Sequence, residues 1–195
     1  MSEPPWLIAG LGNPGPQYAA TRHNVGYLVL DVLAGRMGQK LAKHRRANAD
    51  AAEGRLEGHR AVLLRSRSFM NESGGSIKAA ADYAKIAPEQ IVLVYDEIDI
   101  PFGTLRLKFG GGEGGHNGVR SAKRSLGTPD FYRVRVGVSR PPVRMDAADY
   151  VLRPFSGTER KELPSVVERA ADAVEMLLTQ GLDAAQNYYN TGSVD

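Results

Sequence analysis

The sequence has no cysteine among its 195 residues, which excludes disulfide bonds, thiol catalysis and zinc sites with cysteine ligands. No apolar run approaches the roughly 18 residues that a membrane-spanning helix needs. Residues 1–5 contain neither the basic stretch nor the apolar stretch with which a secretory signal begins. We therefore expect a cytoplasmic protein that has no membrane partner.

Several other signatures are missing from the chain. No G-x-S-x-G segment presents a serine nucleophile, and there is no internal repeat, linker or low-complexity tract that would divide the sequence. Hydrophobic residues make up 42% and charged residues 24%, which is typical of a globular protein that buries a core. We expect residues 1–195 to form a single domain.

Charge is distributed unevenly along the sequence. Basic residues outnumber acidic residues over 36–67 and 106–135, whereas acidic residues predominate over 146–195. This segregation indicates either one basic face of the kind that binds a polyanion, or solvated charge that is clustered only along the sequence. Charge alone leaves both interpretations open.

Strands and helices intermingle in the predicted secondary structure, which favours an α/β fold with a mixed sheet. We expect strands at 6–11, 49–56, 60–65, 90–95, 104–109 and 131–138, and helices at 24–37, 73–86, 119–126 and from 157 onward. A capping box of Ser156 and Glu159 should begin the last helix, Pro164 should kink or restart it, and Gly181 should end it. The expected domain is a twisted mixed β-sheet flanked by helices.

Residues 10–15 (GLGNPG) satisfy the G-x-G-x-x-G pattern of dinucleotide-binding loops. That pattern should open a helix whose N-terminus binds the pyrophosphate, but two prolines stiffen this stretch and helical spacing begins only later. Asp31 has the spacing of the ribose-binding acid, yet it lies inside an expected helix and not at a strand end. We therefore favour a loop that presents Asn13 and, shortly after it, His23.

Polar side chains follow several of the predicted strands. In an open α/β sheet, ligands bind beyond the carboxyl ends of the strands, so residues at these ends are expected to converge. The candidates are Asn13, His23, Met70, Asn71, Asp96, His116 and Asn117.

This set contains the groups needed for general-base catalysis by a histidine. An imidazole accepts a proton near neutral pH, and an adjacent carboxylate would fix its tautomer and stabilise the imidazolium that forms. Asparagine amides can position a carbonyl or stabilise an oxyanion. Since there is no cysteine and no serine elbow, the set predicts direct attack of water on an acyl carbon.

Other interpretations of the same residues stay open at this point. His23 could satisfy backbone groups, Asp96 could lie in a solvated turn, and Asn71 could cap a helix. A metal site made by His23, Asp96 and His116 is conceivable, but no H-x-x-x-H or comparable spacing supports it, so no metal is expected.

Together these segments resemble the bacterial peptidyl-tRNA hydrolase family over nearly the whole chain. The resemblance rests on 10–15 (GLGNPG), 18–26 (YAATRHNVG), 69–74 (FMNESG), 95–101 (YDEIDIP), 110–118 (GGGEGGHNG) and 131–137 (FYRVRVG). Glu113 stands where the family more often has a histidine, which affects only the local charge of that loop.

The resemblance implies hydrolysis of the ester that joins a peptide to the 3′ end of tRNA. It implies a single mixed-sheet domain that acts as a monomer and needs no metal or cofactor. His23 resembles the catalytic base, Asp96 its partner and Asn13 an amide that holds water or the peptidyl group. Substrate contacts are implied for Tyr18, Met70, Asn71, His116 and Asn117.

The resemblance also points to a tRNA contact at Arg106, Lys108 and Arg133, which match the family's basic cluster near the 5′-phosphate. Phosphate contacts position a nucleic acid without reading its bases. Ordinary exposed strand residues would look the same in the sequence, so both interpretations stand.

Two rival functions remain. An RNA-binding protein on the same scaffold that has lost catalysis should have a broken His/Asp/Asn set, whereas the set is complete here. A dinucleotide-dependent oxidoreductase should bind NAD or NADP at residues 10–15.

Overall fold

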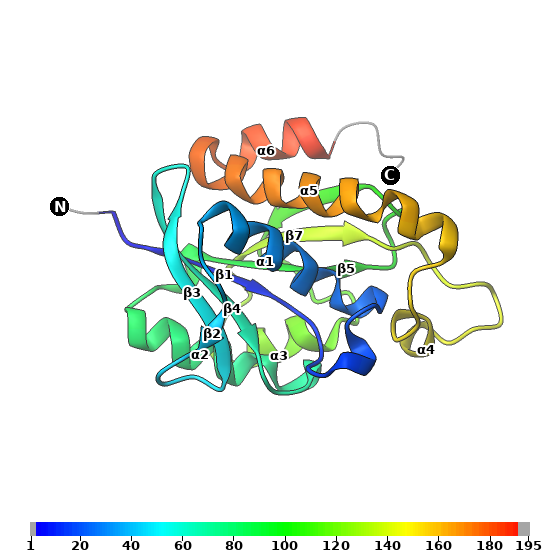
Figure 1. Cartoon of the computed structure of the whole chain (residues 1–195), viewed down its shortest axis with the longest axis horizontal. Helices are drawn as coiled ribbons and strands as arrows, with labels where there is room; N and C mark the ends of the chain where they lie inside the picture. The colour runs from blue at the N-terminus through cyan, green and yellow to red at the C-terminus, as the bar shows by residue number, and fades with distance from the viewer. Residues whose placement is uncertain (1–2, 191–195) are drawn as a thin grey trace.

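A computed structural model of the chain describes residues 3–190, and its centre is a seven-stranded mixed sheet (Figure 1). The strands lie in the order β2-β3-β4-β1-β5-β7-β6. They are β1 (Trp6–Gly10), β2 (Ala42–Lys43), β3 (Ala49–Leu56), β4 (His59–Ser66), β5 (Ile91–Glu97), β6 (Leu105–Phe109) and β7 (Tyr132–Gly137). The four central strands β4, β1, β5 and β7 are parallel, and antiparallel pairing adds β3 and β2 at one edge and β6 at the other. The predicted α/β class and mixed sheet are confirmed.

Helices cover both faces of this sheet (Figure 1). The α-helices are α1 (Val25–Arg36), α2 (Ser73–Ala84), α3 (Asn117–Leu126), α4 (Ala147–Val151), α5 (Gly157–Gln180) and α6 (Leu182–Tyr189). Short 3-10 helices are η1 (Pro16–Tyr18), η2 (Arg22–Asn24), η3 (Met70–Glu72) and η4 (Pro88–Gln90). Within the described residues, no helix is long and apolar enough to cross a membrane.

Two hydrophobic cores form because side chains alternate across the central strands. Ile8 of β1 and Val92 of β5 join the core shared with α1 and α5, while Leu7 and Leu93 join the core shared with α2 and α3. All four side chains are fully buried. A nearly continuous apolar run is what a strand covered on both faces requires, which is why β1 and β5 were predictable.

Gly26 allows α1 to lie directly on the sheet. A Cβ at this position would be 2.3 Å from the carbonyl oxygen of Val94 in β5, so any side chain would push the helix away. The close approach brings η2, which directly precedes α1, to the carboxyl end of β5. The position of His23, which lies in η2, depends on this placement.

The structure differs from the sequence-based expectation in three helical regions. α5 runs unbroken from Gly157 to Gln180, so the expected restart at Pro164 is wrong. Pro164 is exposed there, and water can therefore solvate the carbonyl group that lacks a helical donor. The capping box of Ser156 and Glu159 is confirmed. Helices α4 and α6 were not predicted, since each is too short to produce a clear helical period.

Candidate active site

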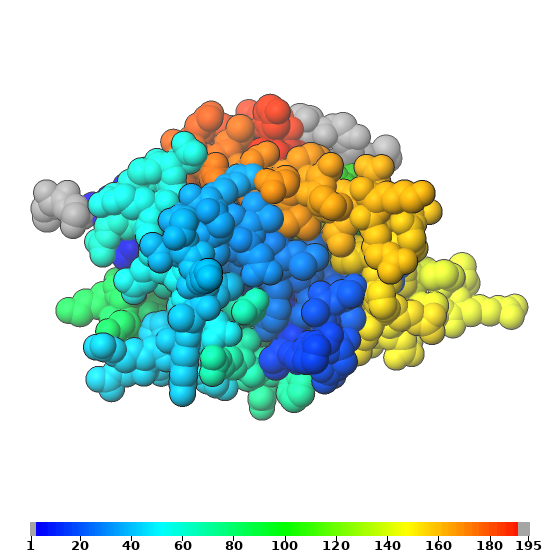
Figure 2. All heavy atoms as spheres, in the orientation of Figure 1, coloured from blue at the N-terminus to red at the C-terminus, as the bar shows by residue number. Residues whose placement is uncertain are grey.

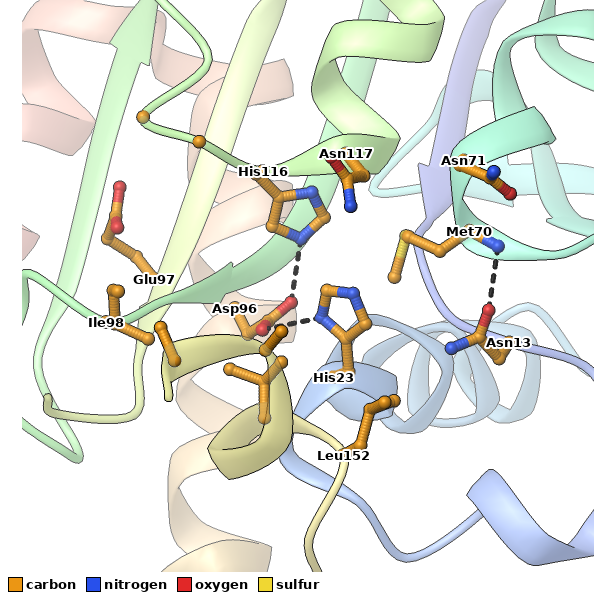
Figure 3. Close-up of a pocket in the computed structure, with 15 residues that line it drawn as sticks. Asn13, His23, Met70, Asn71, Asp96, Glu97, Ile98, His116, Asn117 and Leu152 are labelled. Atoms are coloured by element: carbon orange, nitrogen blue, oxygen red, sulfur yellow. Dashed lines mark hydrogen bonds and ion pairs between the residues drawn. The ribbon is translucent and has the colours of Figure 1, made fainter. Parts of the chain in front are cut away.

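An open cleft lies beyond the carboxyl ends of β1 and β5, where the sequence predicted that polar residues converge (Figure 3). Its polar wall is formed by Asn13, His23, Asn71, Asp96, Glu97, His116 and Asn117. Its apolar wall is formed by Met70, Ile98, Ala147, Ala148, Val151 and Leu152. All seven candidates from the sequence line this cleft, as expected from strand-end topology, and Glu97 joins them without having been predicted.

His23 and Asp96 form the centre of the polar wall. The η2 turn carries His23, and Asp96 is the penultimate residue of β5, buried against the sheet. His23 Nδ1 is 2.8 Å from Asp96 Oδ2 (Figure 3). The other ring nitrogen, Nε2, faces the cleft between Asn117 and Met70 (Figure 3). The predicted contact between the histidine and its carboxylate partner is thus present.

His116 makes a second contact with the same carboxylate, which was not predicted from the sequence. His116 Nε2 is 2.9 Å from Asp96 Oδ1. His116 is also the N-cap of α3, where its Nδ1 accepts hydrogen bonds from the backbone N–H groups of Gly118 (3.1 Å) and Val119 (3.4 Å). Because Nδ1 acts as an acceptor, the proton of a neutral His116 must be on Nε2, which donates it to Asp96.

These hydrogen bonds determine the protonation of His23 as well. Asp96 is an acceptor for both histidines, so His23 donates its Nδ1–H and keeps the lone pair of Nε2 for the cleft. This is the tautomer that a general base needs.

Burial and charge act in opposite directions on these groups. Burial alone would raise the pKa of Asp96, but the two facing imidazoles hold the pKa of this carboxyl well below its usual range. For His23, burial lowers the pKa, and the charge and hydrogen bond of Asp96 more than offset that effect, so its pKa is raised. Asp96 therefore stays ionised and supports the imidazolium form of His23.

Asn13 is held rigidly at the edge of the cleft. Its side-chain oxygen accepts a hydrogen bond from the backbone N–H of Met70 at 2.7 Å. Its backbone is clamped by the Asn24 side chain, which makes two hydrogen bonds of 2.9 Å. Because the oxygen of Asn13 is used, its NH₂ group is turned toward the cleft as a donor (Figure 3). Asn24 was not identified from the sequence, although it directly follows His23.

Tyr18 does not line the cleft, contrary to the prediction. It lies in η1 and packs edge-to-face against the exposed Phe69 at a ring-centroid distance of 6.2 Å. The apolar wall made by α4 was also missed. The available signal was Asp146, whose side chain accepts from the backbone N–H of Ala148 and so caps this five-residue helix.

Basic side chains of β6 and β7 lie on one face of the sheet edge. Cross-strand neighbours pair Arg106 with Arg135, and Lys108 with Arg133. Directly opposed like charges are unfavourable in a sheet. Burial and the neighbouring guanidinium groups lower the pKa of Lys108, and Arg135 is 4.0 Å from Glu97. Arg135 lies two residues after Arg133 in the sequence and was not among the predicted site residues.

Arg133 does not fit its predicted role as a phosphate contact. Its side chain is fully buried, and its guanidinium donates to the carbonyl oxygens of Gly111, Gly112 and Pro129. A buried guanidinium with several carbonyl partners supports the glycine-rich loop and cannot reach a nucleic acid. The exposed-strand alternative is wrong for this residue too.

Among residues 3–190, the ligand atoms of His23, Asp96 and His116 lie within 4.8 Å of one another, close enough to hold a metal ion. Each carboxylate oxygen of Asp96, however, already faces one imidazole N–H at hydrogen-bond distance. The hydrogen bonds account for the proximity of the three side chains without a bridging ion.

Comparisons with known proteins agree on one family. A sequence model described as peptidyl-tRNA hydrolase matches residues 7–195. The peptidyl-tRNA hydrolase of Frankia casuarinae is 59% identical over 95% of this chain and 94% of its own length. That of Rhodococcus erythropolis is 58% identical over 96% and 98%. The fold is similar to the crystal structure of peptidyl-tRNA hydrolase from Acinetobacter baumannii, with a TM-score of 0.89 and 35% identity over 96% of this chain and 95% of that one.

Proposed function

The chain belongs to the peptidyl-tRNA hydrolase family, and we propose that His23 is the general base that activates water for the hydrolysis of peptidyl-tRNA. The reaction cleaves the ester between a peptide and the 3′ end of tRNA and frees both. The observation that carries the proposal is the 2.8 Å contact between His23 Nδ1 and Asp96, which leaves Nε2 unprotonated in the cleft. General-base catalysis by a well-placed group accelerates such reactions by about 10²–10⁴.

The proposed reaction proceeds through one tetrahedral intermediate. Nε2 of His23 takes a proton from water as the water oxygen attacks the acyl carbon, and Asp96 stabilises the resulting imidazolium. The NH₂ group of Asn13 is placed to donate to the oxyanion. When the intermediate collapses, the ester bond to the ribose breaks, and the imidazolium returns its proton to the ribose oxygen. The products are a free peptide carboxylate and tRNA.

The volume of the cleft suits the acyl end of the substrate. Its volume is about 310 Å³, at the lower end of the range for small-molecule sites. Asn71 and Asn117 are assigned to the acylated amino group and the peptide backbone, and Met70 and His116 to the walls around them. A site built on such hydrogen bonds would reject a free aminoacyl-tRNA, which leaves these partners unpaired.

We assign the tRNA phosphates to Arg106 and Lys108, with Arg135 in place of the buried Arg133. These side chains extend from the edge strand β6 and its neighbour β7. The like-charge pairing across these strands costs stability, and a bound phosphate would offset it. The arrangement favours the polyanion interpretation of the basic segment 106–135.

We further propose that residues 1–195 act as one domain, as a monomer and in the cytoplasm. Every residue assigned to the reaction comes from this single chain, so no second copy is needed to complete the site. Peptidyl-tRNA is produced by ribosomes, which supports a place in the cytoplasm.

The test is hydrolysis of an N-acetylaminoacyl-tRNA by wild type and His23→Ala. We expect His23→Ala to lose at least about 10² in kcat. The control is His59→Ala, because His59 lies at the start of β4, does not line the cleft, and has its Nδ1 3.1 Å from Glu3 Oε2; it should keep the wild-type rate. A folded His23→Ala protein with near-normal kcat would show that His23 is not the base. A wild-type protein that does not hydrolyse the substrate would favour the RNA-binding rival.

A further inference from the structure

Arg22 precedes His23 in the η2 turn and takes no part in the mechanism above. Only 7% of its surface is exposed. Its guanidinium lies 2.7 Å from Glu159 Oε1, donates to the carbonyl oxygen of Tyr150 at 3.3 Å, and stacks over the Tyr150 ring with its Cζ 4.0 Å from the centroid. Its backbone N–H donates to the carbonyl oxygen of Arg153 at 3.1 Å. One side chain thus contacts three features of the 150–159 segment.

This segment joins α4 to α5, and Arg22 holds both of its ends. The Glu159 oxygen that receives Arg22 also accepts from the backbone N–H of Ser156 at 2.8 Å, as part of the capping box of α5. Tyr150 lies in α4, and its hydroxyl donates to the carbonyl oxygen of Val138 at 2.7 Å. In Figures 1 and 2 the blue segment that contains Arg22 lies beside the yellow and light-orange segment of α4 and the start of α5.

Helix α4 needs such an anchor. It has five residues, and helices of this length are not stable without tertiary contacts. Its Ala147, Ala148 and Val151, followed by Leu152, form the part of the apolar wall that α4 contributes to the cleft. The distance between this wall and the base therefore depends on contacts from the η2 turn.

A buried guanidinium is energetically unfavourable for a purely structural contact. Removing a charge from water costs free energy that an apolar side chain would not, even when the charge is paired. Arg22 also leaves its Nε without a hydrogen-bond partner in the described structure. The guanidinium makes directional contacts that an apolar side chain cannot make. Because it is planar, stacking on the Tyr150 ring and pairing with Glu159 fix both the position and the orientation of these two partners.

We propose that Arg22 is a positioning residue that holds the α4 wall at a fixed distance from His23, and that this wall is the subsite for an apolar side chain on the residue esterified to tRNA. The proposal rests on the assignment of the cleft to the acyl group. Arg22 itself does not touch the substrate.

The test uses two substrates that share one tRNA and differ only in the acyl group, N-acetylphenylalanyl and N-acetylglycyl. For the wild type we expect kcat/KM to favour the phenylalanyl ester by about tenfold or more, as apolar subsites do. Equal values for the two esters would mean that the wall is not a side-chain subsite and would overturn the proposal.

The variant is Arg22→Met, which keeps the aliphatic stem and removes the guanidinium. We expect KM for the phenylalanyl ester to rise about tenfold, while KM for the glycyl ester changes less than about twofold and kcat is largely retained. The control is Arg36→Met: Arg36 joins α1 to α5 through Glu168, Asp172 and Glu175, away from the cleft, and should lose stability without altering selectivity. Equal losses on both esters would show that Arg22 is merely structural.

Glu159→Gln provides a second variant if Arg22→Met does not fold. It weakens the same ion pair and should raise KM selectively in the same direction, with faster amide hydrogen exchange over 147–152. Unchanged selectivity and exchange in Glu159→Gln would overturn the proposal. The ratio between the two esters is independent of which group acts as base, so failure of this proposal and failure of the His23 assignment are distinguishable.

Discussion

Replacing Asp96 with asparagine should change the tautomer of His23. The carboxylate accepts one N–H from His23 and one from His116. An asparagine offers one oxygen and one NH₂ group, so only one histidine can still donate to it. The other histidine must turn a bare nitrogen toward the NH₂ group.

The helix cap at His116 decides which histidine changes. If His116 gave up its Nε2 proton, its Nδ1 would become protonated and would lose the two hydrogen bonds from Gly118 and Val119. At about 1 kcal/mol for each bond, this alternative costs roughly 2 kcal/mol, which favours the change at His23 by about 30-fold. His23 would then carry its proton on Nε2, the nitrogen that faces the cleft, and would not act as a base.

We therefore expect Asp96→Asn to lower kcat by about 10³–10⁴, since the same substitution in Ser-His-Asp triads costs about 10⁴ for the same reason. The assay is single-turnover hydrolysis of an N-acetylaminoacyl-tRNA, with ¹⁵N NMR of the imidazole nitrogens to identify the tautomer. Asp99→Asn is the matched control, because Asp99 is a half-exposed carboxylate that pairs with Arg140. A folded Asp96→Asn enzyme within about tenfold of the wild type, or one in which His23 keeps its proton on Nδ1, would refute this reasoning.

The pH dependence of kcat/KM tests the same pair. Asp96 raises the pKa of His23, and a protonated His23 is not a base, so activity of the wild type should fall on the acid side around a pKa above the ordinary value of about 6.5. In Asp96→Asn only the effect of burial remains, which lowers the pKa. The acid limb of the residual activity should therefore move to lower pH, and a limb that moves upward would contradict the assignment.

Two further substitutions test the proposed tRNA surface and the close approach of α1 to β5 that positions the η2 turn. Lys108→Ala should raise KM and reduce the slope of log KM against log salt by about one, with kcat unchanged. The control Lys43→Ala, on the opposite edge strand β2, should change neither KM nor this slope. A fall in kcat alone in Lys108→Ala would contradict a phosphate contact. Gly26→Ala should destabilise the fold by about 3 kcal/mol in thermal or denaturant unfolding, because its Cβ would meet the Val94 carbonyl, while Gly35→Ala in the same helix meets open space and should be neutral or stabilising. Similar melting temperatures for the two glycine variants would show that α1 does not need this close approach.

Where the sequence carries a strong local pattern, it predicted the structure well. The apolar run that becomes β5 and the hairpin of β3 and β4 are marked by patterns that depend only on neighbours in the chain. The capping box at Ser156 is equally local. Helix α4 was missed because five residues hardly define a helical period, and its place beside the cleft depends on contacts with Arg22, which is 128 residues away from Tyr150.

The basic residues of β6 and β7 show more clearly what local patterns cannot predict. Alternation along β7 placed Arg133 and Arg135 on the same side but could not show what covers that side. In the folded chain the glycine-rich loop lies over Arg133 and supplies it with carbonyl acceptors, so that residue is buried while Lys108 on the neighbouring strand stays partly exposed. Burial is a property of the whole assembly of elements, and alternation in one strand does not contain it.

The sequence by itself determined the fold class, the family resemblance and which polar residues gather at the strand ends, because these follow from periodicity and from motifs that are contiguous in the chain. Only the tertiary structure decided how they act on one another. Asp96 bridges His23 and His116, and the start of α3 fixes the tautomer of His116. Arg22 fixes the opposite wall. These relations are distances between residues far apart in the sequence, and such distances exist only once the chain has packed.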